Sequence, residues 1–290
     1  MQNKKSGTIV ITGKPNVGKS TFINQIAKNK IAICSPKPQT TRDKIYYIYH
    51  DNDSNIAFID TPGFHIARNK LDEYLNEQIK TSYKYASIFV LMIDLTREID
   101  EEDLKVINLI KSIRNRKLIL VLNKKDKVNN EIINKYIDQI NKLIEIDKTL
   151  VISAKNNNDI NEFLKVIKDY LQYDEILIDD NLSDDFIITE TIREEIIFNC
   201  YKEIPYSTLV KIQDKSYDKI KNIFTIYANI IVEKNSQKPI LVGKNGSMIK
   251  KIGTNVRKKL NNYFDCKIVL HLFVIVENDW RNNKKIFLNN

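Results

Sequence analysis

Residues 8–20 read TIVITGKPNVGKS. A short run of β-branched residues passes directly into the pattern G-x-x-x-x-G-K-[ST], and a helix-like segment follows from Ser20. In such a strand–loop–helix unit, the backbone N–H groups of the loop surround a phosphate group at the N-terminus of the helix. The stretch therefore predicts a P-loop nucleotide site. The residues expected to contact the nucleotide here are Gly13, Lys14, Pro15, Asn16, Val17, Gly18, Lys19, Ser20 and Thr21.

The residue types in this loop suit a nucleoside triphosphate. Lys19 is placed to neutralise the β- and γ-phosphates, and the Ser20 hydroxyl is placed to ligate Mg²⁺. Gly13 and Gly18 allow the backbone to approach the phosphates closely. Taken alone, the motif indicates only that the chain binds a nucleotide.

The first 172 residues alternate between short apolar runs and helix-like segments. The runs expected to be strands are 8–13, 45–50, 55–60, 87–94, 117–123 and 149–154. The segments expected to be helices are 20–29, 101–115, 131–145 and 159–172. This alternation predicts an α/β fold, a mostly parallel six-stranded sheet with helices on both faces. The runs 45–50 and 55–60 lie too close in sequence for a parallel crossover, so that pair is expected to be antiparallel.

Three further motifs each end one of the expected strands: DTPG (60–63), NKKD (123–126) and SAK (153–155). The carboxyl ends of parallel strands meet at one edge of a sheet, where ligands bind. Asp60 is expected to hold Mg²⁺ through a water molecule, and the amide of Gly63 is expected to contact a γ-phosphate. The residues expected to line the nucleotide at these motifs are Asp60, Thr61, Pro62, Gly63, Asn123, Lys124, Asp126, Ser153, Ala154 and Lys155.

The second and third of these motifs indicate which base is read. A carboxylate at Asp126 can accept both the N1–H and the exocyclic amine of guanine, which adenine cannot offer together. The wrong base would leave a buried carboxylate unpaired, so the pattern favours GTP over ATP. Asn123 and Lys124 would hold the loop and cover the ring, and the Ala154 amide would meet the guanine oxygen.

At these motifs the chain resembles the translation-factor-like GTPases and, within them, the Era-like GTPases of bacterial ribosome assembly. The stretch SPKPQTTRDKI (35–45) resembles the first switch of that family. The resemblance implies that Thr41 ligates Mg²⁺ in the GTP state and that Lys19, Thr41 and Gly63 form the catalytic set. From the residues alone, Thr41 is only a polar residue in a proline-bounded loop.

The residue after the DTPG glycine is Phe64, where many GTPases carry a glutamine that orients the attacking water. A phenylalanine forms no hydrogen bond, so intrinsic hydrolysis is expected to be slow. A bound K⁺ ion could supply the missing charge, because related potassium-dependent GTPases use a P-loop asparagine as a ligand and Asn16 matches it. The alternative is that Asn16 simply tolerates a tight loop.

The chain of 290 residues is long enough for two domains and carries a net charge of +9. A basic chain favours polyanions, although its richness in Lys, Asn and Ile could also inflate the charge. Its three cysteines form no C-x-x-C pair, which suits a reducing cytoplasm. No apolar run approaches the ~18 residues of a membrane span. We therefore expect a cytoplasmic protein.

An acidic, turn-rich stretch divides the chain. It predicts a GTPase domain over 1–172, a linker over 173–185 and a second domain over 186–290. In the second domain a helix is expected over 187–201 and strands over 207–213 and 222–233. A glycine-containing loop, a helix over 247–264 and a strand over 267–276 follow.

That loop, LVGKNGSMIKKIG (241–253), is not a second P-loop, because Asn245 follows its lysine where a Mg²⁺ site needs Ser or Thr. Between Lys234 and Leu260 there are eight basic residues and no acidic ones. On a helix over 247–264 the apolar side carries Met248, Ile249, Ile252, Val256, Leu260 and Tyr263, and basic residues gather opposite.

A G-x-x-G loop at a helix N-terminus, beside a basic face, is the design by which KH domains clamp the backbone of about four unpaired nucleotides. A plain turn between two helices is the alternative. The residues expected to bind RNA are Gly243, Lys244, Asn245, Gly246, Lys250, Lys251, Arg257 and Lys258.

The element order matches a type II KH domain, an α+β fold, so the resemblance to Era-like GTPases covers nearly the whole chain, including TIREEI (191–196) and EIPYS (203–207). The resemblance implies that a monomer cycles between GTP and GDP and binds near the 3′ end of 16S rRNA in the 30S subunit. It also implies a role in small-subunit maturation and peripheral association with the inner membrane.

Two interpretations of another class compete with an RNA-linked GTPase switch. Phe64 is compatible with a nucleotide-dependent scaffold in which hydrolysis hardly matters. The basic patch is compatible with a protein that binds a membrane surface.

Overall fold

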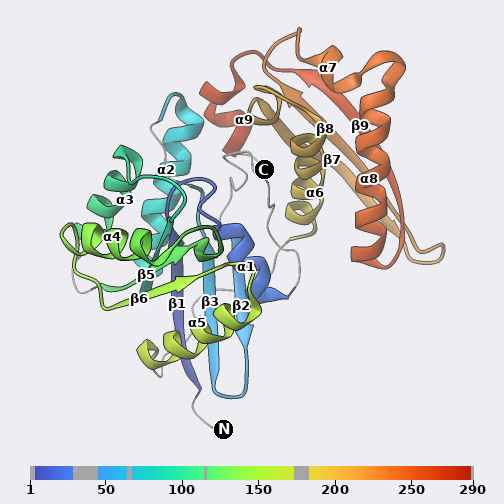
Figure 1. The fold of residues 1–290 in the computed structure, drawn as a ribbon. Helices are drawn as coiled ribbons and strands as arrows, with labels where there is room; N and C mark the ends of the chain where they lie inside the picture. Colours follow the sequence, from blue (N-terminus) through green and yellow to red (C-terminus); the bar gives the residue numbers. More distant parts are fainter. Residues whose placement is uncertain (1–3, 29–44, 64–66, 114–115, 173–182, 289–290) are drawn as a thin grey trace. The chain divides into compact units, whose positions relative to one another are not determined.

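The computed structural model describes residues 4–28, 45–63, 67–113, 116–172 and 183–288, and Figure 1 shows its ribbon. These residues form two compact units. The first comprises residues up to Asn181 except Arg68–Leu71, and the second comprises Arg68–Leu71 and Leu182–Asn290.

The first unit is built on a six-stranded sheet with the order β2-β3-β1-β4-β5-β6. Its strands are β1 (Lys5–Thr12), β2 (Ile45–His50), β3 (Ser54–Asp60), β4 (Ile88–Asp94), β5 (Lys117–Asn123) and β6 (Lys148–Ile152). All neighbouring pairs are parallel except β2 with β3. The expected α/β architecture and its one antiparallel strand are therefore confirmed.

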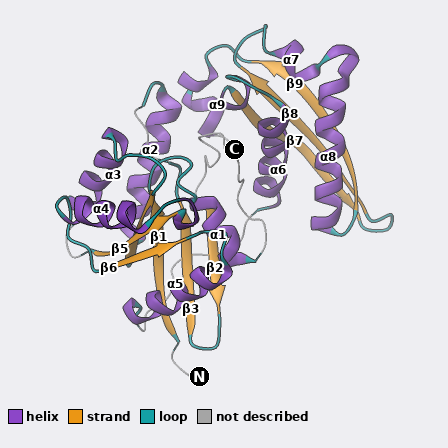
Figure 2. Ribbon diagram, viewed as in Figure 1, coloured by secondary structure: helices purple, strands orange, loops and turns teal. Residues whose placement is uncertain are grey.

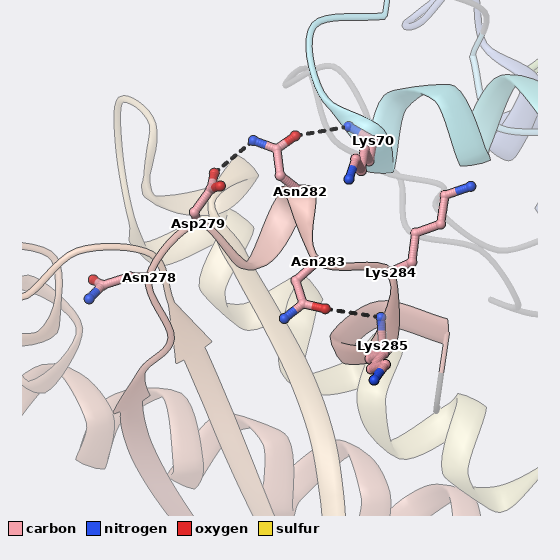
Figure 3. A pocket seen from close by; sticks show the side chains of 7 residues that line it. All are labelled: Lys70, Asn278, Asp279, Asn282, Asn283, Lys284 and Lys285. Atoms are coloured by element: carbon pink, nitrogen blue, oxygen red, sulfur yellow. Dashed lines mark hydrogen bonds between the residues drawn. The ribbon is translucent and has the colours of Figure 1, made fainter.

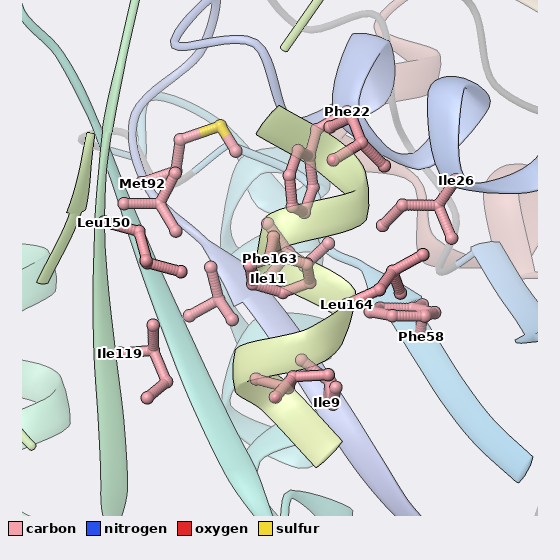
Figure 4. Close-up of a cluster of buried hydrophobic side chains, with 14 of the residues drawn as sticks. Ile9, Ile11, Phe22, Ile26, Phe58, Met92, Ile119, Leu150, Phe163 and Leu164 are labelled. Carbon is pink, nitrogen blue, oxygen red and sulfur yellow. The ribbon is translucent and has the colours of Figure 1, made fainter. Parts of the chain in front are cut away.

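Helices cover both faces of this sheet. The apolar sides of α1 (Lys19–Ala27) and α5 (Asn157–Tyr170) pack into one buried cluster with the strands (Figure 4). Phe163 of α5 lies edge-on against Phe22 of α1, with 4.7 Å between the ring centres. The helices of the opposite cluster are α2 (Lys70–Ser82), α3 (Glu101–Lys111) and α4 (Asn130–Asn141).

Some element boundaries differ from those expected. Strand β1 begins at Lys5, three residues earlier than expected, because Lys5, Ser6 and Gly7 continue the ladder with β3. Helix α2 was not expected, since its segment KLDEYLNEQIKTS carries only Leu71, Leu75 and Ile79 as a buried apolar stripe. Helices α3 and α4 end about four residues before the expected 115 and 145.

The second unit contains a three-stranded sheet with the order β7-β8-β9 (Figure 2). Its strands are β7 (Thr208–Asp218), β8 (Ile223–Val232) and β9 (Lys267–Val276), with β7 antiparallel and β9 parallel to β8. Its helices are α6 (Asp184–Asn199), α7 (Lys238–Val242), α8 (Ser247–Phe264) and α9 (Lys284–Leu288). Buried isoleucines of α6 and residues Ile252, Val256 and Leu260 of α8 close its core on one face of the sheet. This is the expected type II KH order.

Short 3₁₀ turns complete the two units: η1 (Tyr83–Tyr85), η2 (Lys125–Lys127), η3 (Ile204–Tyr206), η4 (Lys244–Gly246) and η5 (Trp280–Asn282). Within the described part of the chain, no helix is both long and apolar enough to span a membrane.

Two expectations about the second unit need correction. The last two residues of the expected linker, Asp184 and Asp185, already form the acidic first turn of α6, because the Ser183 hydroxyl caps that helix. Most of the linker lies outside the described residues. Tyr263, placed on the apolar side of α8, is 57% exposed, and Phe264 beside it fills the core position against Phe224.

Candidate functional site

The loop between β1 and α1 has the strained, glycine-dependent geometry of a P-loop. Gly13 and Gly18 both have positive φ angles, 149° and 110°, which side chains disfavour. A Cβ on Gly13 would lie 2.4 Å from the Met92 carbonyl oxygen, and one on Gly18 would lie 2.2 Å from Asn123 Nδ2. Asn16 is also left-handed, with φ 65°. The loop is thus closed around its own backbone, with no room for larger residues at these glycines.

Lys19, the first residue of α1, turns back over the loop. Its ammonium group donates hydrogen bonds to the carbonyl oxygens of Gly13 (3.0 Å) and Lys14 (2.9 Å). Burial lowers the pKa of Lys19 to about 8, with Asp60 acting in the opposite direction. A buried cation held by neutral carbonyl groups is prepared to interact with an anion.

Next to Lys19, the structure joins two of the expected metal-binding positions. The Ser20 hydroxyl donates to Oδ2 of Asp60 at 3.0 Å, and Asp60 is fully buried at the end of β3. A hydroxyl and a carboxylate are the oxygen ligands that Mg²⁺ prefers, so the donor set fits that ion. Thr61 and Pro62 are buried beyond it, and Gly63 lies against Pro15 of the P-loop.

Lys14 fixes the P-loop to helix α3. Its ammonium group lies 2.7 Å from the Asp100 carboxylate and 2.9 Å from that of Asp103, and its side chain is only 6% exposed. Burial alone would lower the pKa of Lys14, but the two carboxylates outweigh it and raise the pKa above its ordinary value. The same carboxylates form the capping box of α3, so one ion cluster holds both elements.

A second set of cations holds the outer side of the loop. Lys124 donates to the Asn16 carbonyl oxygen at 3.1 Å and lies 2.5 Å from Asp94. Arg97 bridges the Pro15 carbonyl oxygen (3.1 Å) and the same Asp94. Burial would raise the pKa of Asp94, but the bond from Lys124 holds it below its ordinary value.

Asn123 ties the three motif loops together. Its side-chain amide donates to the Val17 carbonyl oxygen at 2.7 Å, and its Oδ1 accepts from the Ala154 amide at 2.8 Å. Asn123 is 2% exposed. The expected holding role of Asn123 therefore has a geometric basis, whereas the Ala154 amide is engaged within the protein.

Beyond Asn123, a pocket of about 650 Å³ opens between the NKKD motif (123–126) and the SAK motif (153–155). Its lining includes Asp126, Ser153 and Lys155, with Val128 and Ile133 as the apolar part. A hydrogen bond from Ser153 lowers the pKa of the exposed Asp126, so this residue is a carboxylate at neutral pH. The sheet thus brings the base-reading residues of two motifs to one opening.

Two of the sequence expectations cannot be placed. Thr41 and Phe64 both lie outside the described residues. Conversely, Asp94, Arg97, Asp100 and Asp103 hold the P-loop without belonging to any motif. The only sequence signal among them is the D-x-x-D spacing of a helix cap over 100–103, which says nothing about Lys14.

The second glycine loop, between α7 and α8, has the opposite character. Gly243 (φ 75°), Asn245 (φ 52°) and Gly246 (φ 77°) are all left-handed. A Cβ on Gly243 would lie 2.6 Å from the Met248 nitrogen, so this glycine is required by the turn itself. A Cβ on Gly246 would have nothing within 4 Å, and Lys244 and Asn245 are exposed. The far side of the loop therefore faces open space.

Helix α8 begins directly after this loop, at Ser247, as the sequence predicts. Lys250, Lys251 and Lys258 are exposed, and Arg257 is half-buried with a bond to Thr254. Lys259 was not among the expected RNA ligands, and its ammonium group instead pairs with Glu194 and Glu195 of α6. Four basic side chains thus lie on the surface of α8, and Lys250 and Lys251 are the two nearest the loop.

Comparison with known proteins agrees with the interpretation of the first glycine loop as a P-loop and of the second as part of a KH domain. Residues 8–124 match the model of the 50S ribosome-binding GTPase family, and residues 203–281 match the KH domain model. Among curated relatives, GTPase Era of Ureaplasma urealyticum is 44% identical over 98% of this chain and 96% of its own length. GTPase Era of Lactobacillus delbrueckii is 38% identical over 96% of this chain and 93% of its own.

Solved structures give the same result. Era in complex with MgGDPNP and nucleotides 1506–1542 of 16S ribosomal RNA matches with a TM-score of 0.92, at 32% identity over 98% of both chains. A variant of Aquifex aeolicus Era bound to GDP·AlF₄⁻ matches with a TM-score of 0.91, at 33% identity and the same coverage.

Proposed function

This chain belongs to the Era family of GTPases, and from that premise we propose that it is a GTP-driven switch whose KH domain binds the 3′-terminal region of 16S rRNA during small-subunit assembly. It is a GTPase with a KH domain.

The nucleotide is proposed to lie along the P-loop, with its phosphates against the backbone of Gly13–Ser20 and its base in the pocket beside Asp126. The observation that carries this placement is the buried Lys19 ammonium, which is held by two carbonyl groups at the N-terminus of α1. A triphosphate would exchange those two bonds for bonds to charged oxygens.

Magnesium is proposed to be held by Ser20 directly, by Asp60 through water and by Thr41 in the GTP state. When bound, Mg²⁺ neutralises charge on the β- and γ-phosphates. The Ser20–Asp60 hydrogen bond already positions both oxygen donors within one site. Lys19 and the loop amides then stabilise the charge that develops as water attacks the γ-phosphorus, and Gly63 contacts that phosphate group.

A monovalent cation at Asn16 is proposed to compensate for the hydrophobic residue Phe64. The left-handed backbone of Asn16 and its carbonyl bond to Lys124 place the residue at the outer edge of the loop. GTP turnover should be faster in KCl than in NaCl, and Asn16→Ala should remove the difference. Equal rates of the wild-type protein in the two salts would disprove this part.

RNA is proposed to lie against Gly246 and the basic surface of α8. The open space at Gly246 supports this, because a phosphodiester backbone needs close approach to the loop amides. The RNA segment follows from the related Era complex with nucleotides 1506–1542 of 16S rRNA.

The deciding experiment measures single-turnover GTP hydrolysis with and without an RNA of that segment. We expect the RNA to change the hydrolysis rate, as required if the two domains form one switch. RNA binding with an unchanged hydrolysis rate would indicate a scaffold instead.

We further propose a cytoplasmic monomer that associates peripherally with the inner membrane through its basic surface. Sedimentation with vesicles containing anionic lipid tests this, and binding should decrease with added salt. Binding to neutral vesicles of equal strength would contradict it.

A further inference from the structure

A second basic feature of the KH unit lies outside every motif in the sequence. It is a shallow pocket of about 470 Å³ lined by residues of the second unit only (Figure 3). The residues that line it are Lys70, Asn278, Asp279, Asn282, Asn283, Lys284 and Lys285.

The charge of this pocket is positive. Lys70, Lys284 and Lys285 are exposed, and none of the three forms an ion pair within the described residues. The single carboxylate, Asp279, accepts a hydrogen bond from Asn282 Nδ2 at 2.7 Å. Three ammonium groups and several side-chain amides around one acid provide hydrogen-bond donors for an anion.

The segment that carries the pocket is firmly held. Trp280 is fully buried, and its indole N–H donates to the Ser207 carbonyl oxygen at 3.0 Å. Arg281 pairs with both carboxylate oxygens of Glu233, at 3.1 Å for one of them. The lysines therefore project from a fixed frame, which lowers the entropic cost of using them in binding.

The segment that carries the pocket and the segment that leads to the second glycine loop both start from the same end of the KH sheet. At this end Val232 of β8 pairs with both Thr208 of β7 and Val276 of β9. The segment that leads into α7 starts after Val232, and the pocket segment starts after Val276. Arg281 and Glu233 join the two segments directly.

From this arrangement we infer that the pocket is a second phosphate-binding site for RNA, which takes a part of the sugar-phosphate backbone beyond the nucleotides held at Gly246. The inference rests on the proposed RNA-binding function. Lysines and amide groups without an aromatic stacking partner suit phosphate contacts, which position RNA without reading its sequence.

The test compares Lys284→Ala/Lys285→Ala with Lys219→Ala/Lys267→Ala. The control pair has the same charge change at the opposite end of the sheet, where Lys267 is opposite Ile223. Binding of an RNA of nucleotides 1506–1542 is measured against salt concentration. The pocket variant should bind several-fold more weakly, with a log–log salt slope shallower by about 1.4, at about 0.7 per lost contact.

The control variant should keep more of the wild-type slope. Both variants should keep basal GTP hydrolysis and the wild-type thermal unfolding of the KH unit, which together show that both units are folded. Equal slopes for the two variants, or an unchanged slope in the pocket variant, would overturn the inference. Loss of binding only to phosphatidylserine vesicles would assign the pocket to lipid and overturn it too. If wild-type protein binds no RNA, the proposed function itself has failed.

Discussion

Two glycine loops in this chain combine left-handed residues with a lysine and lead directly into a helix, yet their surroundings differ. In the loop over 13–20, added Cβ atoms would meet the Met92 backbone and the Asn123 side chain. In the loop over 243–246, Gly246 borders open space. The first loop packs closely against neighbouring parts of the protein, whereas the second exposes its backbone to solvent at Gly246.

The lysines of the two loops also differ in their exposure to solvent. Lys19 is buried and bonded to two carbonyl groups, whereas Lys244 is exposed. A closed loop suits one small ligand of fixed geometry, and an open loop suits a chain that extends beyond it in both directions. Similar sequence elements therefore serve different ligands because the neighbouring strands close around only one of them.

The largest effect should come from Gly13→Ala compared with Gly246→Ala. The first places a methyl group 2.4 Å from a backbone oxygen at a φ of 149°. It should cost about 3 kcal/mol or more, in stability and in GDP binding. The second adds only left-handed strain, about 1 kcal/mol. Thermal unfolding and GDP titration measure both, and equal losses would show that the second loop is also closed.

Asp126→Asn tests whether the opening beside the first loop reads guanine. An amide supplies only one acceptor where guanine presents two donors, so GTP affinity should fall roughly 100-fold, at about 2–3 kcal/mol for a charged hydrogen bond. Asp138→Asn makes the same charge change on the exposed surface of α4 and should leave affinity unchanged. A similar fall in both variants would mean that charge, not base reading, is responsible.

Much of this architecture could be predicted because hydrophobic pattern and motif position agree along the chain. The P-loop and the DTPG, NKKD and SAK motifs each lie at the carboxyl end of the strand that the sequence indicates. Lys14 shows where prediction stops. Its partners lie at the start of α3, more than 80 residues away. The spacing of Asp100 and Asp103 indicates a helix cap and gives no sign that a lysine pairs with them.

The charge at the second loop can be separated from its backbone geometry with Gly246→Asp and Gly246→Asn. Both side chains tolerate the left-handed backbone at φ 77°, so the two variants share the same strain. Only aspartate places a negative charge where a phosphate is proposed to lie. RNA affinity should fall roughly tenfold more in the aspartate variant, about 1.4 kcal/mol. Equal affinities would remove the phosphate from this position.

The smallest effect concerns pH and Lys19. Because the pKa of Lys19 is about 8, its ammonium form predominates at pH 7. Bound phosphate stabilises that form and raises the pKa, so GDP affinity should be constant below pH 8. Above pH 8 it should fall by up to about tenfold per pH unit.

The stability of the nucleotide-free protein should change in the opposite direction. The folded-state pKa of Lys19 lies below the ordinary lysine value of 10.5, so burying the cation costs stability at neutral pH. That cost disappears as pH rises from about 8 towards 10.5. Nucleotide titration and thermal unfolding between pH 7 and 9 measure the two trends. Lys19→Arg, whose guanidinium stays charged, should show neither, and identical pH slopes in that variant would exclude Lys19 as the titrating group.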